Sequence, residues 1–403
     1  MTRIVCVGGG PAGLYFSIVM KLGHSDTTVA VLERHPVGVT YGWGVVFWDD
    51  FLASLHRSDP RTAQAVRDEA HVWRGQEVWL PGERVVYLGG HGYSISRARL
   101  LEILTSRAEE LGVDVRFECP VTGSELLQGA DLVVAADGVN SAIRESRRQA
   151  FGTSASLGRN KYIWLGTDRV FRAFTFAFEQ TRAGPIWFHA YPSAQDISTL
   201  IAECPPQTWE GLGFAALAQD ESAALLKEIF ATHLHDHRLL CQATEFATRS
   251  AWLNFRHICN DRWYDGDTVL LGDAAHTTHF SVGAGTLLAV EDAIELGCCL
   301  SSQRADLEAA VTEFDRRRRL ELRTRQAAAL RSMEWFERLE IPGDRDAVRF
   351  GFELWTRRDD HAVWRRALHY LTQYRAIRHV RSGLASARRK VRFHHWFSDN
   401  ALR

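Results

Sequence analysis

The chain has 403 residues, enough for more than one hydrophobic core, and 46% of them are hydrophobic, as in globular proteins. A formal net charge of −1 argues against bulk binding of nucleic acid, and no apolar run approaches the roughly 18 residues of a membrane-spanning helix. The seven cysteines show neither C-x-x-C pairs nor metal-ligand spacing. We therefore expect reduced thiols, no metal and, without a signal-peptide pattern, a cytoplasmic protein.

The first motif follows a short apolar strand expected at 4–7. Three glycines after it match the G-x-G-x-x-G pattern, which gives a tight turn, lets the backbone approach a pyrophosphate and lets a helix pack closely on the strand. A second expected strand, 29–32, ends at Glu33, whose carboxylate is placed to accept a hydrogen bond from a ribose 2′-OH. The pattern predicts a dinucleotide with a free 2′-OH, which is FAD or NAD. The residues expected to contact it are Gly8, Gly10, Pro11, Ala12, Gly13, Glu33 and Arg34.

The segment 36–51 is rich in glycine and aromatic residues and is expected to be a loop. Packing between domains would explain its aromatic side chains. Trp43, however, follows the ribose carboxylate closely, which suggests a wall beside the ligand. We therefore expect Trp43 and Phe47 to contact a substrate.

Strand-like sequence follows at 77–88, and Arg97, Leu100 and Leu104 further along have R-x-x-L-x-x-x-L spacing. His91 lies just before Arg97. A histidine hydrogen-bonded within a loop is the simpler interpretation of this residue, and a histidine that faces the substrate is the alternative.

A second motif lies at 131–144, where an expected strand ends at Asp137 and Gly138 and a helix opens with Ser141 and Arg144 on one turn. Beyond it, apolar and polar residues alternate in four stretches between 160 and 204, which predicts a mostly antiparallel sheet. A helix at 221–233 and a strand at 248–255 are expected to follow. The side chains expected to share a pocket or core on the sheet are Trp164, Phe176, Phe178, His189 and Tyr191.

The third motif begins with a strand at 269–271, which runs into Gly272 and Asp273, then into a loop, and then into a helix that begins near Thr286. Such a strand, turn and helix direct backbone N–H groups and a helix N-terminus towards a space for an anionic or electron-accepting ligand. Plain α/β scaffolding is the alternative for this stretch alone. A long helix is expected at 307–339, packed on the back of the sheet.

Together the three motifs resemble those of the single-component FAD-dependent aromatic hydroxylases, which para-hydroxybenzoate hydroxylase exemplifies. That family carries G-x-G-x-x-G, D-G-x-x-S-x-x-R and G-D-A-x-H in this order, and this chain has all three. The resemblance implies an α/β fold with a Rossmann-like FAD-binding domain, an inserted mostly antiparallel β-sheet substrate domain and a helical C-terminal segment. It also implies that the R-x-x-L-x-x-x-L spacing opens a helix at Arg97, with the arginine on the side of FAD. The further contacts with FAD that it implies are Arg97, Asp137, Gly138, Gly272, Asp273, Gly283, Ala284, Gly285 and Thr286.

The expected domains are discontinuous. The FAD-binding domain comprises 1–75, 97–158 and 257–340, and the substrate domain comprises 76–96 and 159–256. Residues 341–403 form a basic helical segment, with nine Lys or Arg and no Asp or Glu between 361 and 398. This segment either docks on an acidic body or receives an anionic ligand.

The resemblance narrows to a branch that contains salicylyl-CoA 5-hydroxylase and 2-aminobenzoyl-CoA monooxygenase. Shared phrases are YGWGVVF at 41–47, GGHGYSI at 89–95 and GDAAHTTHFSVGAGT at 272–286. The tryptophan hydroxylase of the violacein pathway shares GWGVV and GRNKYIW, so a free indole substrate stays open. These relatives replace a proline-containing loop of the wider family with the sequence at 279–281, which leaves His279 as a polar group near the flavin.

The resemblance also implies the chemistry. NAD(P)H reduces FAD, the reduced flavin binds O₂ as a C4a-hydroperoxide, and one oxygen is transferred to an electron-rich ring or alkene. A general base would take a proton from a phenol or amine substituent, and His279, His189 and His91 are the candidates in that order. Tyr191, His189 and His279 are also expected to contact the substrate.

The expected function is hydroxylation or epoxidation of an aromatic or related cyclic acyl-CoA thioester by a monomer or homodimer, without a nucleic-acid or membrane partner. Hydroxylation of a free indole or another aromatic metabolite is one alternative. An FAD-dependent reductase without oxygenase activity is another, because flavin reductases carry similar second and third motifs.

Overall fold

The computed structural model describes residues 2–40, 42–82, 84–121, 127–242, 251–303, 306–343, 346–358 and 373. The chain forms two compact units. Unit 1 comprises residues 1–71, 94–162 and 252–337, and unit 2 comprises 72–93, 163–251 and 338–403. The domain boundaries expected from the sequence stay a prediction. Within the described residues, no helix combines the length and the apolar character that a membrane crossing requires.

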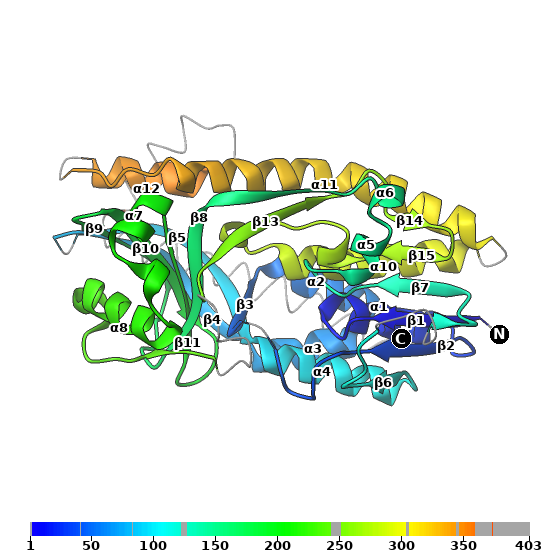
Figure 1. Cartoon of the computed structure of the whole chain (residues 1–403). Helices are drawn as coiled ribbons and strands as arrows, with labels where there is room; N and C mark the ends of the chain where they lie inside the picture. The colour runs from blue at the N-terminus through cyan, green and yellow to red at the C-terminus, as the bar shows by residue number, and fades with distance from the viewer. Residues whose placement is uncertain are drawn as a thin grey trace. The chain divides into compact units, whose positions relative to one another are not determined.

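Unit 1 is built on a mostly parallel sheet (Figure 1). In spatial order its strands are β14 (Tyr264–Asp265), β15 (Thr268–Leu270), β7 (Leu132–Ala135), β1 (Arg3–Val7), β2 (Thr28–Leu32) and β6 (Asp114–Arg116). Among these described strands, β14 and β15 pair in the antiparallel sense and the other neighbours are parallel. β7, β15 and all but the first residue of β1 are buried, as expected for a parallel sheet that helices cover on both faces.

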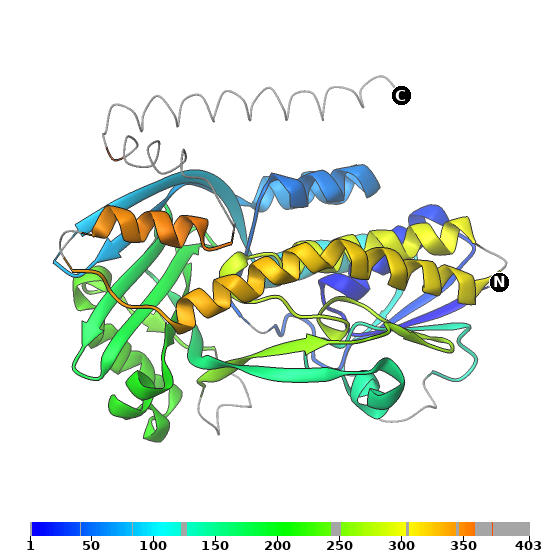
Figure 2. The same cartoon turned by 90° about the horizontal axis from the view of Figure 1, so that it is seen from above.

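The helices of unit 1 include three that were expected from the sequence. Those expected to begin at Arg97, near Thr286 and at 307 are confirmed as α4 (Arg97–Glu110), α10 (Gly285–Ser302) and α11 (Leu307–Glu337). α1 (Pro11–Gly23) packs against α4 and α10, and α11 runs beside α10 (Figure 2). The others are α2 (Asp49–Ser58), α3 (Pro60–Glu69), α5 (Ala142–Ser146), α6 (Arg148–Phe151) and the short 3-10 helices η3 (Gly272–Ala274) and η4 (Phe280–Val282).

The second sheet is mostly antiparallel, as expected, and lies largely in unit 2. Among the described residues its strands are, in spatial order, β12 (Leu239–Leu240), β8 (Ser154–Thr167), β11 (Ser198–Cys204), β10 (Gly184–Pro192), β9 (Phe174–Thr181), β4 (His71–Leu80), β5 (Arg84–Ser96) and β3 (Gly44–Phe47), with β13 (Leu253–Cys259) paired to β8. β9, β10 and β11 pair in the antiparallel sense, whereas β4 and β9 are parallel.

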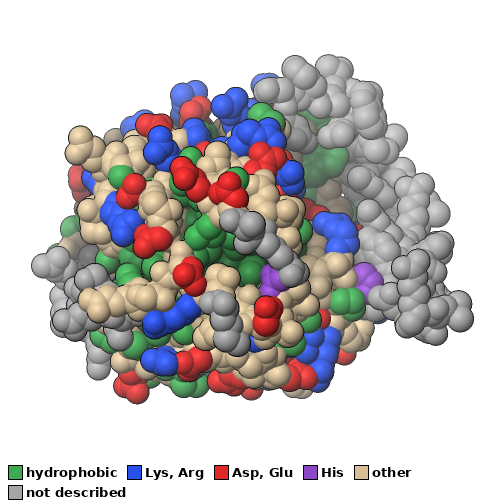
Figure 3. Space-filling view, turned by 90° about the vertical axis from the view of Figure 1, so that its right-hand side faces the viewer, with side chains coloured by type: hydrophobic (Ala, Val, Ile, Leu, Met, Phe, Trp, Pro, Cys, Tyr) green, Lys and Arg blue, Asp and Glu red, His purple; other side chains and the backbone are tan. Residues whose placement is uncertain are grey.

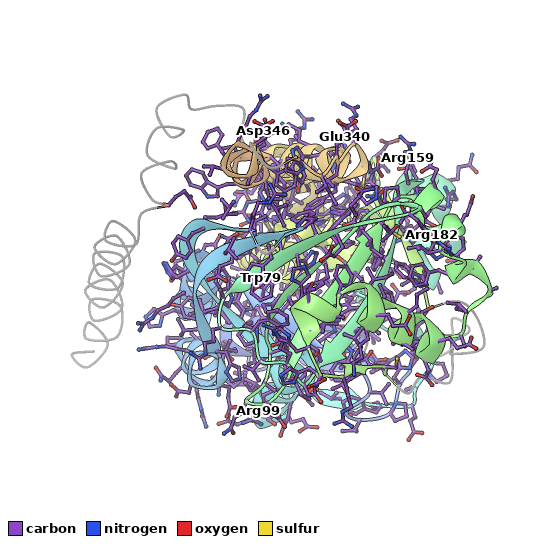
Figure 4. The ribbon with its side chains drawn as sticks, turned by 90° about the vertical axis from the view of Figure 1, so that its left-hand side faces the viewer. Trp79, Arg99, Arg159, Arg182, Glu340 and Asp346 are labelled. Atoms are coloured by element: carbon purple, nitrogen blue, oxygen red, sulfur yellow. The ribbon has the colours of Figure 1, made fainter. Side chains whose placement is uncertain are left out.

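Both faces of this sheet are covered. On one face Phe350 of α12 (Ala347–Thr356) packs edge-on against Phe178, with ring centroids 5.0 Å apart. On the other, Phe230, between α8 (Gln219–Ile229) and α9 (Ala231–Leu234), packs against Phe188 at 4.8 Å. Trp79 of β4, labelled in Figure 4, belongs to this second face through its contact with His233. The elements α7 (Pro206–Gly211) and η2 (Phe214–Ala216) complete unit 2.

Several local expectations were wrong. The segment 36–51 is not a loop throughout, because the buried run Gly44–Phe47 forms β3 and α2 begins at Asp49. Two β-branched valines favour a strand there, and the neighbouring glycines concealed it. His91 lies within β5 rather than in a loop. The helix expected at 221–233 is divided at Phe230 into α8 and α9.

The strands of unit 2 differ from expectation in burial and position. The alternation of residues expected for 160–204 would place every second side chain of a strand on an exposed face. In β11, however, all seven residues are buried. A sheet with both faces covered needs apolar residues at successive positions. The strand expected at 248–255 lies at Leu253–Cys259, and residues 243–250 are outside the described part of the chain.

The charges and thiols also bear on the expectations. On the face shown in Figure 3, Lys and Arg side chains are intermixed with Asp and Glu rather than gathered in a field of one sign. The nine basic residues between 361 and 398 lie outside the described residues. All seven cysteines are free thiols.

Candidate active site

The three motifs meet at one edge of the unit 1 sheet. β1, β2, β7 and β15 are parallel, so their carboxyl ends lie on the same side. These ends lead into Gly8, Glu33, Asp137 and Gly272 respectively. The chain passes from β1 to β2 on one side of β1 and returns to β7 on the other side, and ligands of open α/β sheets bind at such a reversal of strand order. The sheet therefore collects at one place the turns that the sequence singled out.

The first turn permits close backbone approach. Gly8 has a φ of 111°, which favours glycine, and a Cβ there would lie 2.3 Å from the carbonyl oxygen of Ala136. A Cβ on Gly13 would lie 2.2 Å from the carbonyl oxygen of Gly8, so α1 packs directly on the turn. At Gly10, by contrast, no heavy atom of the described residues lies within 4 Å of the position of a Cβ. This open space at the N-terminus of α1 fits the approach of an anionic pyrophosphate.

Glu33 is held in place by backbone N–H groups. Its Oε2 accepts from the N–H of Gly9 at 2.7 Å, and its Oε1 accepts from the N–H of His35 at 2.9 Å. Each carboxylate oxygen keeps acceptor capacity, so the group remains able to accept from a ribose hydroxyl. Arg34 is exposed, and its Nε lies 3.0 Å from a ring nitrogen of His35.

The second motif caps a helix and presents an oxygen without a partner. Asp137 Oδ2 accepts from the N–H of Ala142 at 2.8 Å, at the start of α5. Its Oδ1 is a buried atom that accepts no hydrogen bond from the described residues. Next to it Gly138 has no heavy atom within 4 Å of the position of a Cβ. A buried acceptor beside open space is a fit for a donor on a ligand.

Two contacts join the three motifs. A Cβ on Gly272 would lie 2.9 Å from the Cβ of Ala12, so the third turn rests on α1 of the first motif. The buried Arg144 of the second motif donates from Nη1 to the carbonyl oxygen of Ala274 at 3.1 Å and from Nη2 to that of Val139 at 2.8 Å. One guanidinium therefore links the second motif to the third.

Asp273 and Arg97 are brought close together. The Asp273 side chain reaches open space but is surrounded by protein on most sides, and this desolvation raises its pKa above the ordinary value, whereas the charges of His276 and Arg97 act in the opposite direction. Arg97 opens α4, and its Nε donates to Thr40 Oγ1 at 2.9 Å. A carboxylate and a guanidinium at the rim of one space are suited to hydroxyl and phosphate groups respectively.

The N-terminus of α10 supplies backbone groups. Residues 283–286 are partly exposed, and Gly285 has no heavy atom within 4 Å of the position of a Cβ. The first N–H groups of an 18-residue helix have no partner within the helix, and the helix dipole favours negative charge there. This end of α10 is therefore suited to an electron-accepting ring that gains charge.

A buried ion network behind the third motif was missed by the sequence analysis. Asp292 of α10, 0% exposed, accepts from Arg318 Nε of α11 at 2.8 Å, and its other carboxylate oxygen lies 2.7 Å from His276 Nε2. Burial alone would raise the pKa of Asp292, but His276 and Arg318 lower it below its ordinary value. The spacing of Phe314, Arg318 and Leu322 places this arginine on the apolar stripe of α11 and could have revealed it.

Trp43 contributes a donor without a partner. The carbonyl oxygen of Trp43 accepts from the N–H of Arg97 at 3.0 Å, which fixes its backbone beside the cofactor motifs. The indole Nε1 is a buried atom that finds no acceptor among the described residues, although a buried tryptophan usually has one. Phe47 is buried and packs on Phe51 at 4.7 Å, which favours a core role for it.

His279 is buried in unit 1 just before η4. Its ring lies 4.8 Å from that of Phe255 and 4.2 Å from that of Phe280, measured between centroids. Its Nδ1 lies 2.7 Å from Ser281 Oγ. The ring therefore has a fixed position in the loop between Asp273 and the N-terminus of α10.

The other candidate histidines belong to unit 2. His189 is buried on β10 among Phe174, Phe176 and Tyr191. Desolvation, reinforced by Arg357 and Arg358, lowers the pKa of His189 to about 3. Such a weak base takes up little proton near neutral pH, which favours a packing role.

Tyr191 and His91 complete the predicted set. Tyr191 is buried and stacks on Phe174 with centroids 5.4 Å apart. His91 of β5 is partly exposed and lies edge-on to Tyr93 at 6.3 Å. The structure thus gathers Trp43, Asp273 and His279 in unit 1, whereas Tyr191, His189 and His91 lie in unit 2. Among the described residues, no three His, Cys, Asp or Glu side chains are placed to hold a metal ion.

Comparison with known proteins places these features in a family. The family model described as FAD binding domain matches residues 1–319. Salicyloyl-CoA 5-hydroxylase of a Streptomyces species is 34% identical over 344 residues, which cover 83% of this chain and 65% of that enzyme. This chain therefore spans less than two thirds of the length of that relative.

Two further relatives match over most of their length. The 3-hydroxy-4-methyl-anthranilyl-(aryl-carrier protein) 5-monooxygenase of Streptosporangium sibiricum is 34% identical, with 85% of this chain and 92% of that protein covered. Protodeoxyviolaceinate monooxygenase of Chromobacterium violaceum is 29% identical, with 84% and 90% covered. The fold is that of 2-methyl-3-hydroxypyridine-5-carboxylic acid oxygenase, whose tetrameric form superposes with a TM-score of 0.67 at 20% identity and covers 88% of this chain and 96% of that chain.

Proposed function

This chain belongs to the FAD binding domain family, and on that premise we propose that it is a flavoprotein monooxygenase that uses NAD(P)H and O₂ to insert one oxygen atom into an aromatic acyl thioester. The observation that carries the proposal is the junction of the three motifs at the carboxyl edge of one sheet. Gly272 rests on Ala12, and Arg144 links the second motif to Ala274. A dinucleotide that extends along such an edge would touch all three.

The residues present fit FAD. Gly10 and the N-terminus of α1 would receive the pyrophosphate, and Glu33 would accept from the ribose of the adenosine. Asp273 would accept from ribityl hydroxyls, with Arg97 beside it, and the N-terminus of α10 would face the isoalloxazine. When bound and reduced by NAD(P)H, FAD supplies the activation of O₂.

The protein supplies position and the exclusion of water. The Trp43 indole N–H is a buried donor that a carbonyl or ring nitrogen of the ligand would satisfy. In unit 2, the stacked rings of Phe174 and Tyr191 form a flat apolar surface of the kind that holds an aromatic ring. Exclusion of water around a ligand protects a reactive oxygen species from side reactions with water.

The thioester is the more specific part of the proposal. Two of the relatives act, by their names, on an aryl group joined to coenzyme A or to an aryl-carrier protein, and both are 34% identical to this chain. Both acyl groups are attached as thioesters. We therefore favour an aromatic or related cyclic thioester over the corresponding free acid, with hydroxylation or epoxidation as the reaction.

The test compares a thioester with its acid. Purified protein loaded with FAD is given salicylyl-CoA or benzoyl-CoA, or the free acid at the same concentration, and NAD(P)H oxidation is measured together with the hydroxylated product. The proposal expects product from the thioester at a kcat/KM at least about a hundredfold above that of the acid, the discrimination that about 3 kcal/mol of lost contacts gives. Equal kcat/KM values for the acid and the thioester would contradict the assignment of a thioester substrate.

One observation favours a second candidate. The relative from Chromobacterium violaceum is, by its name, a monooxygenase of protodeoxyviolaceinate, which is not a thioester. A free indole or related metabolite is therefore the alternative substrate in the same assay. Turnover under ¹⁸O₂ separates both from a reductase, because a product without ¹⁸O would end the monooxygenase assignment.

The location is a further part of the proposal. Seven free thiols, four of them at least partly exposed, are what a reducing compartment maintains. We place the enzyme in the cytoplasm on this ground. Secretion to an oxidising compartment, detected by fractionation, would contradict it.

A further inference from the structure

The loop between Asp273 and α10 contains a short chain of buried hydrogen bonds that ends on His279. Ser281 Oγ lies 2.7 Å from His279 Nδ1, and Ser332 Oγ of α11 lies 2.7 Å from Ser281 Oγ. Ser332 is 0% exposed, Ser281 is 6% exposed and His279 is 4% exposed. All three belong to unit 1, so their arrangement is internal to one compact body.

The direction of this chain follows from one backbone group. The N–H of Ser281 points at His279 Nδ1 with an N···N distance of 3.4 Å. A backbone N–H can only donate, so Nδ1 must be the acceptor and carries no proton. In a neutral imidazole the proton then resides on Nε2. The conclusion depends on the backbone N–H of Ser281, which can only donate. It does not depend on the position of a hydroxyl hydrogen, which can rotate.

The two serines reinforce the same assignment. A hydroxyl has a single proton, and Ser281 directs it to Nδ1, which already accepts from the backbone. Ser281 Oγ can then accept from the hydroxyl of Ser332, 2.7 Å away. Donation runs from Ser332 to Ser281 to His279, so α11 controls the protonation pattern of a ring in the candidate active site.

The surroundings of the ring prevent a simple reversal. Phe255 and Phe280 lie against it, at centroid distances of 4.8 and 4.2 Å, so a flip that exchanges the two nitrogens would have to displace packed rings. An exchange of tautomers without a flip would place a ring N–H against the N–H of Ser281. Packing therefore opposes the ring flip, and the Ser281 N–H opposes the exchange of tautomers.

We propose that His279 acts as a hydrogen-bond donor through Nε2–H, towards an oxygen of the substrate or cofactor, and not as a general base, and that Ser281 and Ser332 are the positioning residues that hold it in this form. The proposal rests on the proposed function, because that function puts the loop beside the flavin. It replaces the base role that the sequence suggested for His279. In the neutral and in the charged form alike, Nε2 carries a proton, so this role does not depend on the titration of the ring.

The first test reads the tautomer directly. Protein with ¹⁵N-labelled histidine, loaded with FAD, is studied by NMR correlation of ring carbon-bound hydrogens with ring nitrogens, and His279 is assigned by the signal lost in His279→Gln. We expect a protonated Nε2 and an unprotonated Nδ1 near neutral pH. A protonated Nδ1 would overturn the proposal. This measurement needs no turnover, so it decides the tautomer even if the proposed activity fails.

The second test separates a donor from a base. Glutamine places an N–H near the position of Nε2 but cannot take up a proton, so His279→Gln should keep kcat within about tenfold of the unaltered enzyme. His279→Ala should lose about 10²–10³ in kcat, the usual effect of removing one donor from a reacting oxygen. If glutamine is as inactive as alanine, the donor role is wrong. A kcat that falls at acid pH in the unaltered enzyme, but not in His279→Gln, would also contradict it.

The positioning residues have their own readout. Ser281→Ala removes the hydroxyl donor to Nδ1 and keeps the backbone donor, and Ser332→Ala removes the hydroxyl donor to Ser281. We expect both to increase the share of the Nδ1–H tautomer in the NMR spectrum and to lower kcat with little change in KM, while the absorbance of bound FAD stays unchanged. Ser301→Ala, a serine of α10 that bonds to His24, is the matched control and should leave the His279 signals in place. Unchanged His279 signals in both test variants would refute the positioning role.

Discussion

Single residues decide whether the proposed cofactor can bind, and Gly10 gives the most direct test of the space assigned to the pyrophosphate. A Cβ at this position has no heavy atom of the described part of the chain within 4 Å, and φ is −76°, so alanine fits the folded chain. The same methyl would project into the space assigned to the pyrophosphate. We expect Gly10→Ala to keep its stability and to raise the Kd for FAD by about tenfold to a hundredfold, the effect of about 1–3 kcal/mol of overpacking.

A matched glycine makes that result specific. Gly343, outside the motifs, likewise has no heavy atom within 4 Å of its Cβ position, so Gly343→Ala should change neither the Kd for FAD nor the melting temperature. Titration of each variant with FAD, followed by flavin fluorescence, gives both values. An unchanged Kd in Gly10→Ala would remove the first turn from the site.

His189 gives a prediction on pH. Its pKa is lowered to about 3, by burial first and by Arg357 and Arg358 next, whereas in the unfolded chain it stays near 6.5. Between these values the unfolded state binds more protons, so the free energy of unfolding falls as the pH drops through this window. In His189→Phe this contribution is absent, and the slope should be smaller by about 1.4 kcal/mol per pH unit.

Urea unfolding between pH 6.5 and 4 measures that slope. His235 is exposed and has a φ of 52°, which asparagine tolerates, so His235→Asn should leave the slope unchanged. A slope in His189→Phe equal to that of the unaltered chain would show that His189 takes up its proton normally in the folded state.

At the scale of residues, the sequence predicted the positions of the motif residues at the ends of strands better than it predicted roles. Gly8, Glu33 and Asp273 stand at the carboxyl ends of strands because their motifs fix the local backbone. The role of His279 was not accessible, because it depends on Ser332, 53 positions away in the sequence, and on the direction of a backbone N–H. The buried indole N–H of Trp43, which has no acceptor among the described residues, could likewise be recognised only in the structure.

At the scale of elements, the pair α10 and α11 supports the third motif. Asp292 of α10 joins His276 and Arg318, and its N–H partner Gly272 lies in the motif itself at 3.2 Å. Asp292→Asn removes the buried carboxylate that pairs with both His276 and Arg318, while Glu291 and Glu321 still pair with the guanidinium. We therefore expect a loss of about 1–3 kcal/mol in the free energy of unfolding at pH 7, the penalty for buried groups that lose one charged partner.

The pH dependence of that loss follows from the lowered pKa of Asp292. The contribution is fully present above about pH 3.8, the value of the unfolded carboxyl, and is lost as the pH falls through the lower folded pKa. The difference between Asp292→Asn and the unaltered chain should therefore shrink in strong acid. Glu313→Gln, which removes exposed pairs on α11, is the control and should have little effect. A constant difference at every pH would contradict the ionic account.

Elements were predictable where one pattern ran without interruption. The start of α10 near Thr286 and the long α11 follow from sustained helical spacing. β3 was hidden within 36–51 because Gly38 and Gly42 before it and Gly44 at its start signal a turn more strongly than four residues signal a strand. The uniform burial of β11 reflects packing by helices on both faces, which a single sequence does not report.

At the scale of the whole molecule, the family resemblance that the three motifs carry was enough to predict the fold class. A parallel sheet places the ends of β1, β7 and β15 at one edge, so motifs separated by more than a hundred residues become neighbours. The substrate was less predictable, because unit 2 carries an aromatic face that would suit many rings. The assignment of a thioester substrate therefore depends on the relatives and on the assay that compares the thioester with the free acid.

The most direct test of the account is the stoichiometry of FAD binding. Protein purified in its folded form, or refilled with FAD and freed of excess, is measured by the ratio of flavin absorbance to protein concentration. One site built from three joined motifs predicts a ratio close to one, with a flavin spectrum perturbed from that in water. Folded protein that is colourless and retains no FAD when it is offered would contradict the account.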